Sequence, residues 1–363
     1  FFSLDFDLSC LFNAFSIYYS KEKHRMGDYR DSWAEYREIL ASTKKKLLKK
    51  PRYSEAIAEF RQLSQRMIDE ESLENAALCH LEIVHIYEKM GNWNQQRKNL
   101  LKAGRLFLDS QKNRTLMQYT AYSDMKNMVT DCYLRAIDVT MREGFLISAG
   151  VYSVELGTAM MEMNDSASAY EHLMRGYRLL QNDYYFHLNA TSKIVYCAYT
   201  MGKYEEVLVM LDHLWADSMK RQPLSSLGKR VLVEAEINTV LVLIMSKRSA
   251  DGRHKLLLSS FDNDFSESVD SVLNEYEFAI IKSFTDAVKN KDISLARQIH
   301  SFSLTKLMDD TGRKAALDII ESIPCISMDA LRGRVDSHRN PDELKESRLE
   351  MVVRMRELAT EYL

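Results

Sequence analysis

The scarcity of turn-forming residues is the feature that most constrains this chain. Its 363 residues contain only four prolines and twelve glycines, whereas soluble proteins average roughly 5% proline and 7% glycine. A sheet-rich fold needs many tight turns, and those turns depend on such residues. Apolar residues, in contrast, recur every three to four positions along most of the chain, which is the period of an amphipathic helix. The sequence therefore predicts an all-α fold.

Start and stop signals separate the predicted helices. The first helix carries one apolar stripe, formed by Trp33, Tyr36, Leu40 and Leu47. Pro51 ends this helix, because proline cannot continue the hydrogen-bond ladder, and the next helix begins near Tyr53. Ser72 is the predicted N-cap of the helix that follows, and Gly91 is its predicted stop. Segments of helical period continue to about Ile323.

A related sequence recurs where one helix ends and the next begins. It starts at residues 50, 90, 163, 201 and 289, as KPRYSEAIAEFRQL, MGNWNQQRKNLLKA, MNDSASAYEHLMRG, MGKYEEVLVMLDHL and KNKDISLARQIHSF. The gap between the second and third has room for another helix pair, over 119–162. Helix pairs at a period of about 40 residues are typical of tetratricopeptide-like repeats. We therefore predict a tetratricopeptide-like α-solenoid of antiparallel helix pairs, although most of the standard Trp-Leu-Gly-Tyr and Pro positions are missing.

Four segments follow from these patterns. Residues 1–25 are predicted to be an extraneous or disordered N-terminal extension, because Met26 looks like a natural start, and 26–323 form the solenoid. Residues 324–340 read as a flexible linker. Residues 341–363 are predicted to form an amphipathic helix whose apolar side contains Leu344, Leu349, Val352, Met355 and Ala359. Such a helix must bury that side, either on its own body or on a partner.

Composition excludes several classes of protein. The net charge is −3, so the whole molecule offers no field that would attract polyanions. The five cysteines are odd in number and scattered without a C-x-x-C pair, which favours reduced thiols in the cytosol. No stretch approaches the roughly 18 to 20 apolar residues of a membrane span. We expect a cytoplasmic protein without integral membrane association.

The common motifs of catalysis and cofactor binding are missing. The sequence contains no G-x-G-x-x-G, Walker A, G-x-S-x-G, H-E-x-x-H or EF-hand pattern. Cys79, Glu82 and His85 come near one helix face, but no second ligand pair accompanies them. A core cysteine beside surface polar groups is the preferred interpretation. We therefore expect a non-enzymatic protein with no cofactor and no metal.

A basic run closes the first predicted helix, with cations at Lys44, Lys45, Lys46, Lys49, Lys50 and Arg52. A solvated helix end is the favoured interpretation, since lysines near a helix C-terminus stabilise the helix dipole. Contact with an acidic partner surface is a second interpretation. Nuclear import or nucleic-acid binding is a third, although no recognition module accompanies the run. We expect no nucleic-acid partner, and a nuclear pool stays open.

The region around this run resembles a known family. The matching residues are Tyr36-Arg37, the Lys-rich run closing at Pro51, Glu55-Ala56, Phe60, Gln62-Leu63, Glu71, Leu73, Ala76-Ala77, Cys79 and Leu81. AGRLFL (103–108), EINTVLVLIM and NKDISLARQI add to them. The chain resembles the 40-kDa huntingtin-associated protein family, clearly over 33–108 and more weakly to about 322. It departs from that family in having only KRQPLSSLG in place of a Pro-rich stretch, and in the segment after Pro324.

The resemblance implies a binding subunit that forms a 1:1 complex with huntingtin, packs between the HEAT-repeat domains of that large protein and stabilises it. It also implies a link to early endosomes through a Rab GTPase. The runner-up is a SNAP-like adaptor of membrane-fusion (SNARE) complexes, which uses similar helical repeats and MGxY-type junctions. A pull-down discriminates the two: one very large HEAT-repeat partner favours the first, and SNARE proteins with an AAA ATPase favour the second.

Candidate partner-binding residues fall into an aromatic, a basic and an acidic group. They are Trp33, Tyr36 and Trp93; Lys46, Lys49, Lys50 and Arg52; and Asp309, Asp310, Asp318 and Glu321. Core packing is the favoured alternative for each aromatic residue. The acidic group is expected to meet a basic patch on the partner. The family has no catalytic, metal or cofactor residues to carry over.

Overall fold

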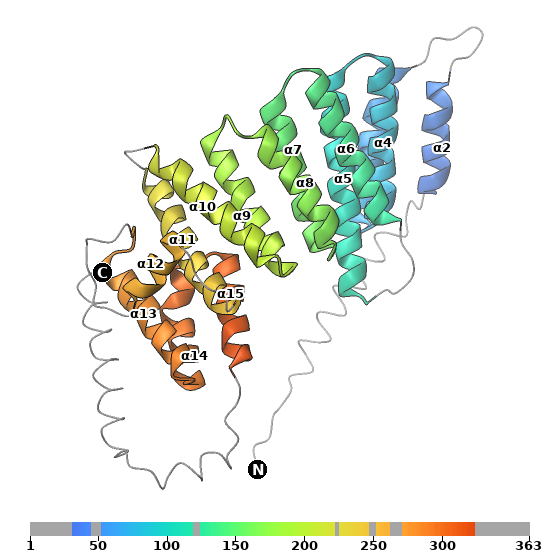
Figure 1. Ribbon diagram of the computed structural model, residues 1–363. Coiled ribbons are helices and arrows are strands. Elements are labelled where there is room, and N and C mark those ends of the chain that lie inside the picture. The colour runs from blue at the N-terminus through green and yellow to red at the C-terminus, as the bar shows by residue number, and fades with distance from the viewer. Residues whose placement is uncertain are drawn as a thin grey trace, which may run out of the picture. The chain divides into compact units, whose positions relative to one another are not determined.

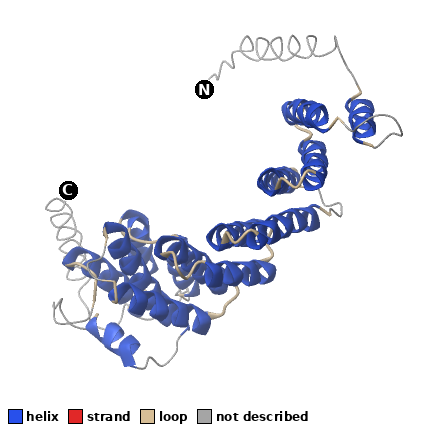
Figure 2. Ribbon diagram, turned by 90° about the horizontal axis from the view of Figure 1, so that it is seen from above, coloured by secondary structure: helices blue, strands red, loops and turns tan. Residues whose placement is uncertain are grey.

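The computed structural model describes residues 31–44, 52–118, 124–221, 225–246, 252–261 and 271–323. Within these ranges the chain forms fourteen α-helices and one short 3-10 helix, and no described residue belongs to a strand. Figure 2 shows only helices joined by loops in the described part. The predicted all-α fold is confirmed. The predicted segments 1–25, 324–340 and 341–363 lie outside the described residues.

The chain divides into two compact units, one up to Ser153 and one from Val154. The helices of the first are α2 (Ser32–Thr43), α3 (Tyr53–Asp69), α4 (Leu73–Lys89), α5 (Trp93–Leu116), α6 (Met125–Arg142) and the first part of α7 (Leu146–Glu162). The second contains the rest of α7, α8 (Ser166–Leu179), α9 (Tyr184–Thr200), α10 (Tyr204–Met219), α11 (Ser226–Ser246), α12 (Gly252–Ser260), α13 (Glu275–Lys289), α14 (Ile293–Phe302), η1 (Leu304–Lys306) and α15 (Asp310–Ser322) (Figure 1).

Six of the helix junctions share one three-residue turn. The middle residue of each has a positive φ between 57° and 81°, and these residues are Glu71, Gly91, Gly144, Asn164, Gly202 and Lys291. At Gly91 the backbone N–H donates to Glu88, and the N–H of the next residue donates to Tyr87 at 2.9 Å. The other five turns repeat this pair of bonds, which is the Schellman motif. The next helix begins two residues later each time, so consecutive helices run antiparallel. The predicted junctions at 90, 163, 201 and 289 fall on these turns.

The core of the first unit lies between α3, α4, α5 and α6. Its largest fully buried side chains are Phe60, Leu63, Met67, Ile83, Leu100, Phe107, Tyr133 and Ile137. Each buried side chain of this size contributes about 1.5–3 kcal/mol relative to exposure. Gly104 of α5 lets the ring of Tyr133 approach, since a Cβ at this position would lie 3.0 Å from that ring.

The second unit is centred on α11. Residues 235–243 of this helix are all buried. The one carboxylate among them, Glu236, accepts a hydrogen bond of 3.0 Å from the Val272 backbone. Burial raises the pKa of Glu236. α11 packs against α10, α12 and α15, so it joins its two neighbours in the chain to the last described helix.

The first helix is shorter than its apolar stripe predicts. α2 ends at Thr43, and Lys44 already has an extended backbone (φ −76°, ψ 138°). The Ser42 and Thr43 hydroxyls donate to the carbonyls of Ile39 and Leu40 at 2.6 and 2.8 Å. These side chains compete for the carbonyls of the last turn, which weakens the continuation of the helix. Leu47 and Pro51 lie outside the described residues.

Candidate functional site

Trp33 and Tyr36 lie on α2, which packs against α3 and α4. The Tyr36 hydroxyl donates a 2.9 Å hydrogen bond to Glu82 of α4, and its ring meets Phe60 edge-on, with the centroids 5.5 Å apart. Burial and the bond to Glu82 raise the pKa of Tyr36. Trp33 packs against Tyr36 but keeps 42% of its surface exposed. Tyr36 therefore packs within the helix bundle, whereas one face of the Trp33 ring is exposed to solvent.

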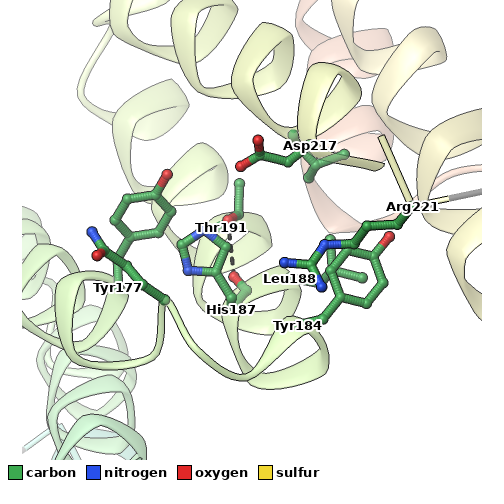
Figure 3. A pocket seen from close by; sticks show the side chains of 9 residues that line it. Tyr177, Tyr184, His187, Leu188, Thr191, Asp217 and Arg221 are labelled. Carbon is green, nitrogen blue, oxygen red and sulfur yellow. Dashed lines mark hydrogen bonds between the residues drawn. The ribbon is translucent and has the colours of Figure 1, made fainter. Parts of the chain in front are cut away.

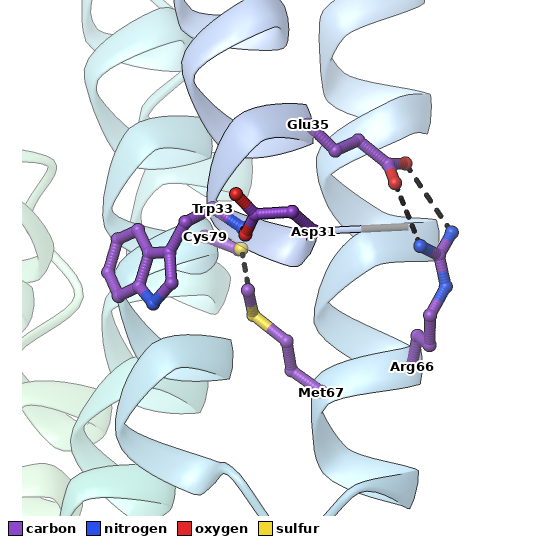
Figure 4. Close-up of polar contacts among 6 residues, drawn as sticks. All are labelled: Asp31, Trp33, Glu35, Arg66, Met67 and Cys79. Carbon is purple, nitrogen blue, oxygen red and sulfur yellow. Dashed lines mark hydrogen bonds and ion pairs between the residues drawn. The ribbon is translucent and has the colours of Figure 1, made fainter. Parts of the chain in front are cut away.

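Polar contacts fix the first helix on the second (Figure 4). The Arg66 guanidinium donates to both carboxylate oxygens of Glu35, at 2.8 and 3.4 Å. The Asp31 side chain caps α2 by accepting from the Trp33 backbone at 3.0 Å. Cys79 is buried with its Sγ 3.8 Å from Sδ of Met67, and burial raises the pKa of its thiol to about 12. Such a thiol is protonated and inert at neutral pH.

The three residues weighed as a metal set have other contacts. Cys79 faces Met67, Glu82 accepts from Tyr36, and His85 lies 3.8 Å from Glu88. Over the described ranges, no three His, Cys, Asp or Glu side chains are grouped as a metal ion would require. Among the described helices, none combines the length and apolar character needed to cross a bilayer.

An exposed apolar surface lies at two neighbouring turns of the first unit. Trp93, at the start of α5, stacks on Phe145 with ring centroids 5.4 Å apart. Phe145, Leu146 and Ile147 are 48%, 50% and 44% exposed at the start of α7, and Met90 is also exposed. We call Met90, Trp93, Phe145, Leu146 and Ile147 the turn patch. The Arg97 guanidinium lies 5.4 Å from the Trp93 ring and 5.9 Å from the Tyr152 ring, which anchors the indole.

The turn patch contains the residues that the sequence reasoning missed. Only Trp93 was a candidate, and it was expected to pack in a core. The signal available was the run of three large apolar residues directly after Gly144, where a turn exposes side chains. Exposed apolar groups gathered in this way make the turn patch a candidate interaction surface.

Two of the four acidic candidates, Asp309 and Asp318, already accept hydrogen bonds within the second unit. Asp309 caps α15 by accepting from the Gly312 backbone at 2.9 Å, and it also accepts from Asn238 of α11 at 3.1 Å. Asp318 accepts a 2.8 Å hydrogen bond from the Tyr199 hydroxyl of α9. Asp310 is exposed and lies 3.3 Å from Arg313, and Glu321 is exposed. The acidic group is therefore partly structural.

The basic candidates are only partly described. Arg52 precedes α3 and pairs with Glu55 at 3.1 Å, with both side chains exposed. An exposed pair of this kind contributes little to stability. Lys46, Lys49 and Lys50 lie outside the described residues. A role for them in partner binding stays a prediction.

A cavity of about 220 Å³ lies between α8, α9 and α10 (Figure 3). The ring of His187 lies tilted against that of Tyr177 with the centroids 4.2 Å apart, and burial lowers the pKa of His187. The charged groups at its edge have partners, because Arg221 lies over the Tyr184 ring and Asp217 is 3.3 Å from Lys220. The cavity is thus a gap in a polar helix junction, and its edge charges are already engaged.

Comparison with curated proteins gives one clear relationship. A stretch of 151 residues is 26% identical to the 40-kDa huntingtin-associated protein of Rattus norvegicus, and the protein of Mus musculus matches equally well. This chain is distantly similar to the 40-kDa huntingtin-associated protein. The resemblance found in the sequence is confirmed at the level of a family match. The alignment covers 41% of this chain, and the chain spans about 40% of the length of the curated relatives it matches.

Two further comparisons add little to the similarity with the 40-kDa huntingtin-associated protein. No protein-family profile matches the chain. A solved structure described as the apo form of RapI aligns over 86% of this chain and 81% of its own, with 14% identity and a TM-score of 0.27. At that score the superposition bears on neither fold nor function.

Proposed function

We propose that this chain is a non-enzymatic scaffold subunit that forms a stable 1:1 complex with huntingtin. In this proposal it packs between the HEAT-repeat domains of huntingtin and stabilises their arrangement, acting in the cytoplasm. Association with early endosomes through a Rab GTPase is part of the same proposal. The observation that carries it is the similarity to the 40-kDa huntingtin-associated protein, whose name states its partner.

The turn patch supplies the contact surface in this proposal. Its apolar side chains project at two neighbouring turns, and Trp93 is held by Phe145 and Arg97 before any partner binds. A preorganised aromatic anchor loses little conformational entropy on binding. Aromatic residues are also enriched at the energetic centres of interfaces. A large helical-repeat partner can cover such a patch with an apolar helix face.

The test is recovery of the endogenous complex by size-exclusion chromatography with mass spectrometry. We expect this protein to co-elute with one very large HEAT-repeat protein at equal stoichiometry. Recovery mainly as a free monomer would contradict the proposal. Recovery with SNARE proteins and an AAA ATPase would favour the SNAP-like alternative instead. Co-recovery of a Rab GTPase on early-endosome membranes tests the trafficking part separately.

A pair of substitutions tests the turn patch directly. Leu146→Glu and Ile147→Glu place carboxylates in the first turn of α7, where they favour the helix dipole and leave the fold intact. We expect the double variant to weaken huntingtin binding by about thirtyfold or more, the scale of an interface hot spot. Val209→Glu on α10, which is 52% exposed, is the matched control and should bind normally. Equal binding by both variants would exclude the turn patch from the interface.

A further inference from the structure

The second unit contains an open groove formed by helices distant in the sequence. Two adjoining cavities of about 250 and 350 Å³ share Ser192 and Asp309. Their walls come from the end of α7, from α9, α10 and α11, and from the start of α15. We call this the α9–α11 groove. Its floor is apolar, with Leu188, Val195, Leu211, Leu214, Val231 and Ala235. Tyr185 and Leu227 stand at its edge, and each exposes about half of its surface.

The charge in the groove is predominantly negative. The charged residues that line it are Glu162, Glu234, Asp309 and Asp310, against one cation, Lys193. Glu234 is bound to Arg230 at 3.0 Å, but that arginine is largely exposed and pairs with it from the solvent side. Burial raises the pKa of Glu234, and the negative charge of nearby Asp309 acts in the same direction, whereas the bond to Arg230 and the charge of Arg313 oppose the shift. A cation entering the groove would relieve this repulsion.

The last segment of the chain has the complementary pattern. At about 100° per residue, a helix over 341–363 places six apolar residues within an arc of roughly 120°; they are Leu344, Met351, Val352, Met355, Leu358 and Ala359. Leu363 and Leu349 extend this side beyond the arc, and Val353 lies apart from it. Arg348 falls inside that arc, and Lys345 and Arg356 fall at its edge. All six acidic residues fall together on the far side: Asp342, Glu343, Glu346, Glu350, Glu357 and Glu361. One side of the predicted helix is therefore mainly apolar with three basic residues, and the other side is mainly acidic, with Val353 among the acidic residues and Arg354 beside them.

We propose that residues 341–363 fold back as an amphipathic helix into the α9–α11 groove of the same chain, with Arg348 directed at the carboxylates of Glu234 and Asp309. The apolar arc covers the floor of the groove, and the acidic side faces water. In the opposite orientation, six carboxylates would meet the acidic groove. The charges thus select which side of the helix docks.

The connection is long enough for this return. α15 runs from Asp310, beside the groove, to Ser322, which is about 20 Å away at 1.5 Å per residue. Residues 324–340 can span up to roughly 60 Å when extended. A tether of this length keeps the helix at a high local concentration near the groove. The docking is a property of the isolated chain and is independent of the partner proposed above.

Disulfide trapping in the full-length chain tests this proposal. The described native thiols, Cys79, Cys132 and Cys197, are buried, and Cys10→Ser and Cys325→Ser remove the other two. Ser192→Cys places a thiol in the groove, where the side chain is exposed. It is combined either with Met355→Cys, inside the apolar arc, or with Glu357→Cys, on the acidic side at nearly the same tether length. We expect the first pair to form the intramolecular disulfide at least about tenfold faster.

Charge reversal provides the second measurement. Arg348→Glu should slow the Ser192→Cys/Met355→Cys disulfide several-fold, and Glu234→Arg in the same chain should restore it. Equal rates for Met355→Cys and Glu357→Cys would overturn the proposal, since a helix that does not dock presents both sides alike. Disulfides that form only between two chains would also overturn it, because the groove would then accept a second copy.

Discussion

His80 and Asn99 show how one buried polar pair is oriented between α4 and α5. Nδ1 of His80 lies 3.0 Å from Oδ1 of Asn99, and the Asn99 amide nitrogen donates to the Gln95 carbonyl at 2.7 Å. The Asn99 oxygen must therefore accept, so His80 carries its proton on Nδ1. Burial lowers the pKa of His80 to about 4; the bond to Asn99 opposes this, and the charges of Lys102 and Arg61 reinforce it. The neutral ring is the folded form.

This pair predicts a loss of stability in mild acid. The unfolded chain protonates His80 near pH 6.5 and the folded chain only near pH 4, so its contribution is complete above pH 6.5 and is lost as the pH falls to 4. His80→Gln keeps a hydrogen-bond donor but does not titrate. Between pH 6.5 and 4 we expect its unfolding free energy to fall by about 3 kcal/mol less than that of the parent protein. Urea unfolding at a series of pH values measures the difference. His85→Gln, exposed on the same helix, should keep the full dependence; a parallel curve for His80→Gln would contradict the assignment.

The acidic candidates show where sequence reasoning stops at the residue scale. The sequence identifies Asp309 and Asp318 as charges near a helix, which favours a surface role. Their partners, Asn238 and Tyr199, lie 71 and 119 residues earlier in the chain. No local pattern connects residues so far apart, because the pairing exists only once α9, α11 and α15 pack together. The local sequence around the exposed Asp310 and Glu321 does not differ in this respect, so it cannot separate the two structural carboxylates from the two exposed ones.

At the scale of helices, the crossing of α7 and α8 depends on one glycine. A Cβ on Gly157 would lie 2.6 Å from Cγ of Leu173 and 3.1 Å from the Ala169 carbonyl. The two helices therefore approach too closely for any side chain at this point. The local sequence gives no hint of this, since glycine inside a helix normally lowers stability.

The change in unfolding free energy caused by Gly157→Ala is positive or negative according to whether helix propensity or the close contact dominates. Without the contact, alanine would stabilise α7 by up to about 1 kcal/mol through helix propensity. With it, we expect a net loss of about 1–3 kcal/mol from overpacking. Thermal or urea unfolding gives the value. Leu173→Ala removes the opposing atoms, so the double variant should cost clearly less than the sum of the two single changes. Additive costs would mean that the two residues do not compete for space.

The helices themselves were largely predictable. Period, N-cap and stop signals placed the starts at Tyr53 and after Ser72 and the stop at Gly91, and the gap at 119–162 proved to contain α6 and α7. The end of α2 was not predictable, because an apolar stripe shows which side of a helix is buried but not where the helix ends. The hydroxyls of Ser42 and Thr43 bond carbonyls of its last turn, and Lys44 then leaves the helical conformation. The turn patch was missed for a related reason, since apolar residues at a junction look like core until the turn exposes them.

At the scale of the molecule, most contacts join helices that are neighbours in the chain. In such an array, stability is approximately a sum over adjacent elements. Opening of one region then need not open another. This follows from the three-residue turns, which set each helix against the one before it.

Phe60→Ala tests that independence. Phe60 is fully buried between α3 and its neighbours, so its truncation should cost about 3–5 kcal/mol locally. We expect faster amide hydrogen exchange in α3, α4 and α5, with exchange in α13, α14 and α15 unchanged. Mass spectrometry of peptides resolves the two regions. A uniform acceleration along the chain would show a single cooperative unit instead.

The shared turn has a consequence for how this architecture changes over time. Its shape is made by two backbone hydrogen bonds, so the left-handed residue at its centre can be replaced at a cost of about 1–2 kcal/mol. Glu71, Asn164 and Lys291 occupy that position in three of the six turns. Substitutions can therefore accumulate at every side chain of the junction while the spacing of the helices is retained. A repeat of this kind can become unrecognisable to residue-by-residue comparison long before its geometry is altered.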